Sequence, residues 1–229
     1  MAAWPSTFIH STCIQTLRRN HNMAKVLFVK ANDRPADQAV SVKMYETFLN
    51  AYKDANPDDE VTELDLFDVE LPYYGNKAIT AIYKQSQGFP LAEEEQQLAD
   101  LIETYIQQFL SVDKVVFAFP LWNFTVPGPL VTYISYLAQA GRTFKYTAEG
   151  PIGLAGDKKV VLLSARGGDY SNEFMAAMEA ANRFVTSSIG LWGIQPETVV
   201  IEGHNQYKDR SEEILESGLN KVAAIAAGF

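Results

Sequence analysis

Cysteine and histidine are scarce in this chain of 229 residues, and their positions exclude several kinds of chemistry. The single cysteine is Cys13, and the only histidine after Met23 is His204. The body of the chain therefore offers no disulfide, no cysteine nucleophile and no zinc site built from cysteine and histidine. A serine–histidine–aspartate mechanism would depend on His204 alone, and we do not expect this residue to act in catalysis. If the chain is an enzyme, we expect a bound cofactor to supply the chemistry.

Basic residues and long apolar runs are also lacking. Acidic residues outnumber Lys and Arg by 28 to 19, and no basic cluster forms a stripe. Nucleic acids and anionic membrane surfaces are therefore poor partners for this chain. No apolar run approaches the roughly 20 residues that a membrane-spanning helix needs. With 47 % hydrophobic and 21 % charged residues, the composition is that of a globular protein.

The segment 1–22 differs from the rest of the chain. It contains no Asp or Glu, and its Ser, Thr and Arg content faintly resembles an organellar transit peptide. Polar residues interrupt what would be the apolar core of a secretory signal. Met23 is followed by Ala24–Lys25 and an apolar run, which is usual at the start of a cytosolic α/β domain. We expect 1–22 to be a disordered leader or non-native extension, and 23–229 to be a single cytoplasmic domain.

After Met23, runs typical of strands alternate with runs typical of helices. Continuous apolar runs such as Val26–Val29 predict strands that are buried on both faces. The alternation predicts an α/β fold, with a doubly wound parallel sheet of five strands and helices on both faces. The expected strands are 26–29, 61–66, 114–119, 159–164 and 198–201, and the expected helices are 41–55, 93–110, 129–141, 173–188 and 211–227.

A long segment, Asp68–Pro90, interrupts this alternation and contains Pro72, Gly75 and Gly88. Loops of this length in a compact domain are usually functional or take part in an interface. We therefore expect an irregular loop here that covers a pocket or contacts another subunit.

The loop after the first strand has few of the features of a nucleotide site. It lacks the GxGxxG pattern of dinucleotide-binding folds and the Walker pattern GxxxxGK[ST]. It ends at Ser41, where a helix begins, and the free amides and dipole of a helix start favour a phosphate. Ser41 is either part of such a phosphate site or an ordinary helix N-cap.

Two further loops leave the carboxyl ends of the expected strands, where doubly wound sheets bind their ligands. The first, Pro120–Pro129, places Asn123 between two large aromatic residues and suits a flat ligand that needs an apolar wall with a few polar groups. If both aromatics were core residues, the asparagine between them would be unexplained. The second loop, Ser164–Gly168, has adjacent glycines whose amides can approach a ligand closely, although a plain flexible turn would look the same.

Together these loops resemble those of the bacterial FMN-dependent NADH azoreductases, within the flavodoxin-like quinone reductase superfamily. The specific element is Leu121–Phe124, followed by Val126–Pro127 and later by Ala165–Gly168. The resemblance extends over nearly all of Met23–Phe229 and includes Gly141–Tyr146 and Gly150–Leu154. It implies a flavodoxin-like fold, one FMN per subunit and a homodimer with active sites at the interface. It also implies that a hydride passes in two steps from NADH through FMN to azo dyes or quinones.

The resemblance also assigns residues to this site. Those expected to bind FMN are Asn32, Ala39, Val40 and Ser41 around the phosphate, Pro120, Leu121, Trp122, Asn123 and Phe124 along the isoalloxazine ring, and Ala165, Arg166, Gly167 and Gly168 at its pyrimidine side. Phe144 and Tyr146 are expected to contact the substrate. Relatives often carry several serines in the phosphate loop. Here only Ser41 keeps a hydroxyl, so we expect backbone amides to hold the phosphate. No side chain is expected to be catalytic by itself, and no metal is expected.

Two other functions fit the same fold. A flavodoxin-type electron carrier would bind FMN without a substrate pocket, and the acidic charge would suit docking on basic partners. The Asp68–Pro90 segment and the abundance of aromatic residues favour an enzyme over such a carrier. A flavin-free interaction domain would instead give a colourless protein.

Overall fold

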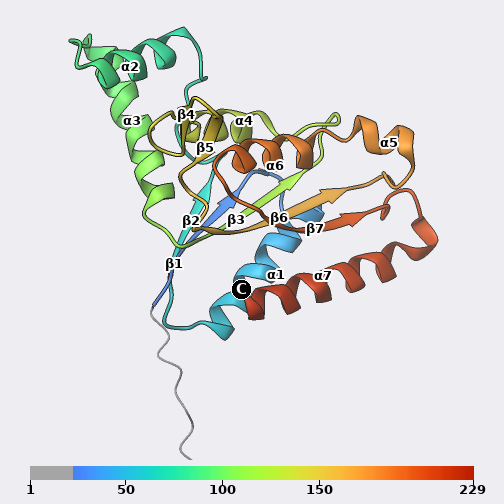
Figure 1. Ribbon diagram of the computed structural model, residues 1–229. Coiled ribbons are helices and arrows are strands. Elements are labelled where there is room, and N and C mark those ends of the chain that lie inside the picture. The colour runs from blue at the N-terminus through green and yellow to red at the C-terminus, as the bar shows by residue number, and fades with distance from the viewer. Residues whose placement is uncertain (1–22) are drawn as a thin grey trace, which may run out of the picture.

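The computed structural model describes residues 23–229, and its centre is a parallel sheet of five strands (Figure 1). The order across the sheet is β2 (Glu60–Asp65), β1 (Lys25–Lys30), β3 (Lys114–Pro120), β6 (Lys159–Arg166) and β7 (Glu197–Glu202). The chain adds β2 on one side of β1 and then continues on the other side with β3. The strand order therefore reverses between β1 and β3, which confirms the predicted doubly wound sheet.

Helices cover both faces of the sheet, as predicted. On one face, α1 (Val40–Ala55) packs against α7 (Ser211–Gly228), while α3 (Glu93–Leu110), α4 (Gly128–Leu137) and α6 (Ala181–Leu191) lie on the other (Figure 1). Alternate residues of β1 enter two separate cores, because successive side chains of a strand point to opposite faces. Within residues 23–229, no helix combines the length and hydropathy needed to cross a membrane.

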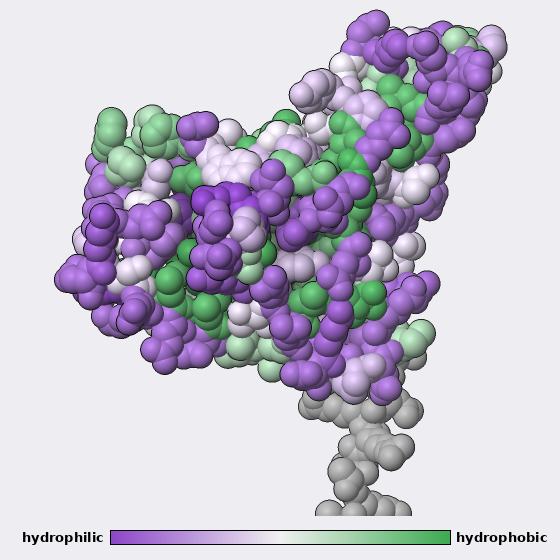
Figure 2. Space-filling view, turned by 180° about the vertical axis from the view of Figure 1, so that it is seen from behind, coloured by the Kyte–Doolittle hydropathy of each residue, from purple (hydrophilic) through white to green (hydrophobic). Residues whose placement is uncertain are grey.

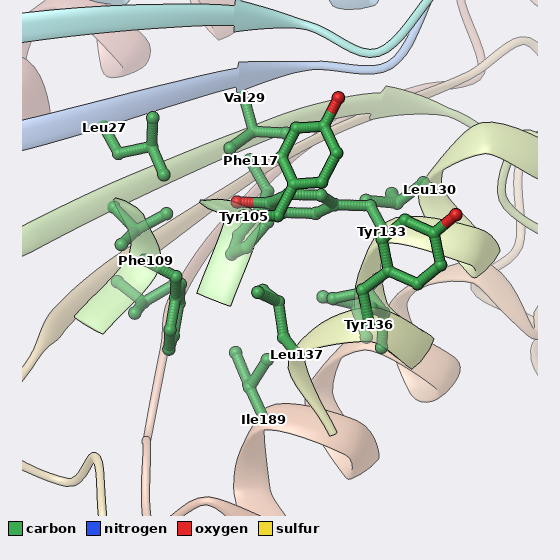
Figure 3. Packing of buried hydrophobic residues seen from close by; sticks show 14 of the residues in the cluster. Leu27, Val29, Tyr105, Phe109, Phe117, Leu130, Tyr133, Tyr136, Leu137 and Ile189 are labelled. Carbon is green, nitrogen blue, oxygen red and sulfur yellow. The ribbon is translucent and has the colours of Figure 1, made fainter. Parts of the chain in front are cut away.

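Aromatic side chains fill much of the core beneath α3, α4 and α6 (Figure 3). The ring of Tyr105 on α3 lies 5.8 Å from the ring of Tyr133 on α4, in an edge-on arrangement. Phe109 meets Trp192 in a similar way, with ring centroids 5.4 Å apart. Such pairs contribute about 0.5–1.5 kcal/mol each beyond the burial of their surface. The first pair joins α3 to α4, and the second joins α3 to the residue that follows α6.

The segment Asp68–Pro90 is not the irregular loop that the sequence predicts. It contains the helix α2 (Asn76–Gln87), which ends at Gly88 in a left-handed conformation with φ of 69°. α2 packs on α3, and Lys84 donates to Glu95 at 2.6 Å. With the beginning of α3 it forms an arm that projects from the body (Figure 1). The prolines and glycines of the segment lie at its ends and obscure the helical pattern between them.

The helix predicted over 173–188 is broken into α5 (Glu173–Met178) and α6. Two hydrogen bonds hold the break. The Asn182 amide donates to the Glu179 side chain at 2.9 Å, and the Ala180 amide donates to the Phe124 carbonyl at 2.8 Å. The second bond links the break to the loop after β3, a contact that a local sequence pattern does not reveal.

A short hairpin between α4 and β6 is absent from the sequence prediction. Its strands are β4 (Phe144–Thr147) and β5 (Gly150–Gly153), which pair antiparallel. A 3-10 turn, η1 (Lys208–Arg210), also precedes α7. The hairpin lies near the amino end of β6, because β5 ends shortly before Lys159 begins that strand.

Gly153 provides a test of the packing between this hairpin and α6. A Cβ atom at Gly153 would lie 2.2 Å from the Gly193 amide nitrogen and 2.2 Å from the Trp192 carbonyl carbon. We expect Gly153→Ala to lower the free energy of unfolding by about 1–3 kcal/mol, because backbone must move to admit the methyl group. Gly190→Ala is the matched control, since its Cβ meets nothing within 4 Å. Urea denaturation of both variants measures the difference, and equal stabilities would contradict the close approach.

Candidate functional site

A cavity of about 360 Å³ lies at the carboxyl ends of the strands, beside the reversal of strand order. Its volume is within the range of small-molecule and cofactor sites. The loops after β1, β3 and β6 all reach it, as does the loop after β7. Ten of the residues assigned from the sequence line it: Asn32, Ala39, Val40, Ser41, Pro120, Leu121, Trp122, Ala165, Arg166 and Gly167.

The loop after β1 ends in a helix start that is open to an anion. α1 has Ala39 as its N-cap, and no side chain caps it. Ser41 is therefore not the N-cap, and its hydroxyl oxygen instead accepts a 2.9 Å hydrogen bond from the Asn32 amide. Both side chains are buried, with exposures of 2 % for Asn32 and 1 % for Ser41. The pair fixes the hydroxyl at the first turn of α1, where the positive end of the helix dipole favours negative charge.

The loop after β3 forms a tight two-residue turn. Trp122 and Thr125 exchange backbone hydrogen bonds of 2.9 and 3.0 Å, and the residues between them have positive φ values, 48° for Asn123 and 67° for Phe124. These features match a type I′ turn, which favours asparagine at its first central position. Asn123 therefore has a conformational reason to stand between two aromatic residues. Phe124 is 42 % exposed, so it is not a core residue.

Several backbone amides of this loop are engaged in hydrogen bonds within the protein. Leu121 donates to the Ala165 carbonyl at 2.8 Å, and Trp122 and Thr125 donate to each other. Among residues 23–229, the amides of Asn123 and Phe124 have no backbone partner. They remain available at the tip of the turn.

Arg166, at the end of β6, is tied to neighbouring segments. Its Nε atom donates to Glu202 at 2.8 Å, and its guanidinium lies 3.7 Å from the Glu179 carboxylate and 5.0 Å from the ring centroid of Tyr170. This side chain joins β6, β7 and the break between α5 and α6. Arg166 lines the cavity, but its charge is already engaged by two carboxylates.

Gly167, the next residue, lies close to Asn205. A Cβ atom on Gly167 would lie 2.4 Å from the side-chain nitrogen of Asn205. The Gly167 carbonyl also accepts hydrogen bonds from the amides of Asn205 and Gln206, at 3.0 and 3.2 Å. The loop is therefore fastened to the segment after β7 and is not a plain flexible turn.

A carboxylate next to these glycines strengthens the same connection. Asp169 accepts hydrogen bonds from the Ser171 amide at 2.8 Å and from the Tyr207 hydroxyl at 2.7 Å. Hydrogen bonds from Ser171 and Tyr207 lower the pKa of Asp169 to about 2, so this carboxylate is ionised at neutral pH.

The structure brings residues into the cavity that the sequence did not suggest. They include Arg34, Lys43, His204 and Asn205. His204 follows the last strand of the sheet, and burial, followed by the positive charge of Lys43, lowers its pKa below the ordinary value of 6.5. The sequence could have indicated His204, because this residue follows the fifth predicted strand. The carboxyl ends of parallel strands meet at one edge of a sheet, where the cavity lies.

Other assigned residues lie outside the cavity lining. Asn123 and Phe124 lie at the tip of the turn, and Gly168 lies one residue beyond the lining. Phe144 is buried in the core, and Tyr146 is 74 % exposed with its ring 5.3 Å from that of Phe144. Both belong to the hairpin near the amino end of β6, so the fold does not bring them to the cavity of their own chain (Figure 1).

Metal chemistry has no evident ligand set here. Within residues 23–229, no group of three or more His, Cys, Asp or Glu side chains is placed to hold a metal ion. The predicted leader, 1–22, lies outside the described residues, so that expectation stays a prediction.

Residues 24–226 match the family described as flavodoxin-like fold, and the chain belongs to this family. Over 208 residues it is 67 % identical to FMN-dependent NADH:quinone oxidoreductase 2 of Bacillus cereus, covering 90 % of this chain and 100 % of that protein. A crystal structure of azoreductase from Bacillus anthracis strain Sterne has a TM-score of 0.88 and 56 % identity, with coverage of 90 % and 100 %. A structure of an FMN-dependent NADH-azoreductase from Bacillus anthracis strain Ames Ancestor, in complex with FMN, has a TM-score of 0.80 and 26 % identity, with coverage of 90 % and 98 %.

The turn after β3 yields a test that separates backbone shape from side-chain chemistry. We expect Asn123→Ala to lower the free energy of unfolding by about 1 kcal/mol, because alanine tolerates the left-handed conformation less well than asparagine. Asn123→Gly adopts that conformation without strain, so its stability should stay within about 0.5 kcal/mol of the wild type. Urea denaturation of both variants is the measurement. Equal losses in both would show that the side chain of Asn123, and not its backbone, stabilises the turn.

Proposed function

We propose that this chain is an FMN-dependent NADH oxidoreductase that reduces quinones and azo compounds. The observation that carries the proposal is the cavity at the reversal of strand order, built jointly by the loops after β1, β3 and β6. These loops hold most of the residues that the sequence resemblance assigns to the cofactor. The names of the similar proteins, which specify FMN, NADH, quinones and azoreductase activity, support the same conclusion.

The residues present fit the chemical parts of FMN. The uncapped start of α1, with the buried Ser41–Asn32 pair, suits the phosphate. Leu121 and Trp122 supply an apolar wall for a flat ring. Gly167 lines the same cavity, where a glycine leaves its backbone amide open to the edge of that ring.

When bound, FMN supplies the redox chemistry by accepting a hydride from NADH and passing it to a quinone or azo acceptor. The chain's own residues hold and orient the flat ring, and Trp122 is steadied by the ring of Phe67, 6.2 Å away. The amides near Gly167 would stabilise negative charge at the pyrimidine edge. Correct placement matters, since an error of about 1 Å can cost roughly a hundredfold in rate.

We also propose a ping-pong order, in which NADH and the acceptor use the same exposed side of the cavity in turn. A cytoplasmic location is part of the proposal, because Met23 and the residues after it resemble the start of a cytosolic α/β domain. Tyr146 is the exposed member of the pair assigned to the substrate. It would reach an acceptor only in the cavity of a second copy, which favours active sites at an interface.

The decisive test is turnover by the purified chain alone. We expect it to bind FMN at about one per chain and to oxidise NADH with a quinone or an azo dye when no other protein is present. Initial rates at several acceptor concentrations should give the parallel double-reciprocal lines of a ping-pong mechanism. An electron carrier would bind FMN but need a partner protein for NADH oxidation, and a colourless protein after reconstitution with FMN would contradict both functions.

We further propose that the projecting arm takes part in a homodimer. The arm formed by α2 and the beginning of α3 exposes large apolar and aromatic side chains: Ile79 is 52 % exposed, Tyr83 58 % and Phe89 51 %. Figure 2 shows hydrophobic side chains among the hydrophilic ones of this arm. A cavity of about 680 Å³ lies between α2, α3 and the end of α4. Exposed apolar patches of this kind often mark contacts between proteins.

Light scattering should therefore give a mass near twice 25.5 kDa for the wild type. We expect Tyr83→Glu to shift the protein toward the monomer, because a buried unpaired charge is costly at an interface. Lys221→Glu, on the exposed side of α7, is the control and should leave the mass unchanged. A wild-type monomer would contradict the dimer but leave the flavin site untouched.

A further inference from the structure

One part of the cavity wall is built by residues outside the loops assigned to FMN. His204 follows β7, and Lys43 lies in the first turns of α1, yet both line the same cavity as Ser41 and Asn32. The Nδ1 atom of His204 is buried and has no hydrogen-bond partner among residues 23–229. Buried polar atoms in proteins are normally hydrogen-bonded, so a partnerless one beside a cavity calls for a ligand or another explanation.

The surroundings of His204 carry an excess of positive charge. Lys43 is close enough that its charge, after the effect of burial, lowers the pKa of His204. Arg34 and Arg166 also line the cavity, and Asp37 is the acidic residue of the lining. Arg166 is already paired with Glu202 and Glu179, and α7 contributes the uncharged Ser211 and Leu215. An anion in the cavity between the lysine and the imidazole would offset the repulsion between them.

We propose that His204 and Lys43 form the positively charged side of the phosphate site. They bind the FMN phosphate together with the first turn of α1. The inference rests on the proposed placement of FMN in this cavity. It also accounts for a peculiarity of the loop after β1, where Ser41 is the one assigned residue with a hydroxyl. These two cations, one on α1 and one after β7, compensate for hydroxyl donors that the loop lacks.

The two residues differ in how pH affects them. A phosphate dianion beside His204 favours the protonated imidazole, so bound FMN raises the pKa of His204 above its value in the apoprotein. The contribution of His204 to FMN binding is therefore present at low pH and is lost as pH rises through the raised pKa. The contribution of Lys43 to FMN binding is expected at both low and high pH.

The test measures flavin affinity and does not depend on enzyme activity. Apoprotein of the full chain is titrated with FMN and with riboflavin, which lacks the phosphate, and quenching of flavin fluorescence gives each Kd. The variants are His204→Asn, His204→Gln and Lys43→Gln, with Lys221→Gln on the exposed side of α7 as the matched control. Titrations at about pH 6 and about pH 8 bracket the ordinary titration range of histidine.

We expect both His204 variants to weaken FMN binding about tenfold or more at the lower pH and less than about threefold at the higher pH. Lys43→Gln should weaken it by about tenfold at both. The Kd of riboflavin should change by less than about twofold in every variant, and Lys221→Gln should bind FMN like the wild type. The ratio of variant to wild-type Kd at each pH cancels the titration of the phosphate itself.

Three other outcomes would contradict the inference, each on a different ground. Unchanged FMN affinity in the His204 variants would remove His204 from the phosphate site and leave the FMN site standing. Equal weakening of FMN and riboflavin would mean that His204 shapes the cavity and does not bind the phosphate. Failure of the wild-type apoprotein to bind FMN would contradict the proposed function itself, and this inference with it.

Discussion

The register between β3 and β6 is the constraint on which the site depends. The pairing extends to the last residue of β3, with Pro120 opposite Ala165, and the Leu121 amide continues the ladder with a 2.8 Å bond to the Ala165 carbonyl. Both strands are buried on both faces, so a shift of one residue would exchange the side chains of the two cores. The Ala31 amide donates to the Ala118 carbonyl at 2.9 Å, which joins the loop after β1 to the same edge. Three loops distant in sequence therefore leave the sheet side by side.

Polar contacts then set the shape of these loops. Arg166 connects the end of β6 with Glu202 on β7 and with Glu179 at the break between α5 and α6. The Gly167 carbonyl fastens the segment after β7 to the same place, and this segment carries His204 into the cavity. These contacts therefore position both Gly167, which we expect at the edge of the flavin, and His204, which the sequence was not expected to place in the site. The proposed chemistry needs this rigidity, because a bound cofactor that does the redox work must be held in one position.

Local patterns in the sequence were sufficient for the five strands, for the helices on both faces and for the loops that line the cavity. The central strands are buried on both faces, so their sequences are continuous apolar runs that are easily recognised. The prediction failed where distant contacts decide the structure. α2 depends on its packing against α3, and the break after α5 depends on a bond to Phe124. The turn at Asn123 was recognised as unusual, but its positive φ follows from the pairing of Trp122 with Thr125, which sequence alone did not show.

We propose that one cavity, at the reversal of strand order, holds the cofactor. A crystal structure of the chain with FMN bound tests it most directly. We expect the isoalloxazine ring to contact Leu121 and Trp122, with the phosphate at Ser41 and the first turn of α1. A flavin seated instead between α2 and the end of α4, against Tyr74 and Arg142, would contradict it.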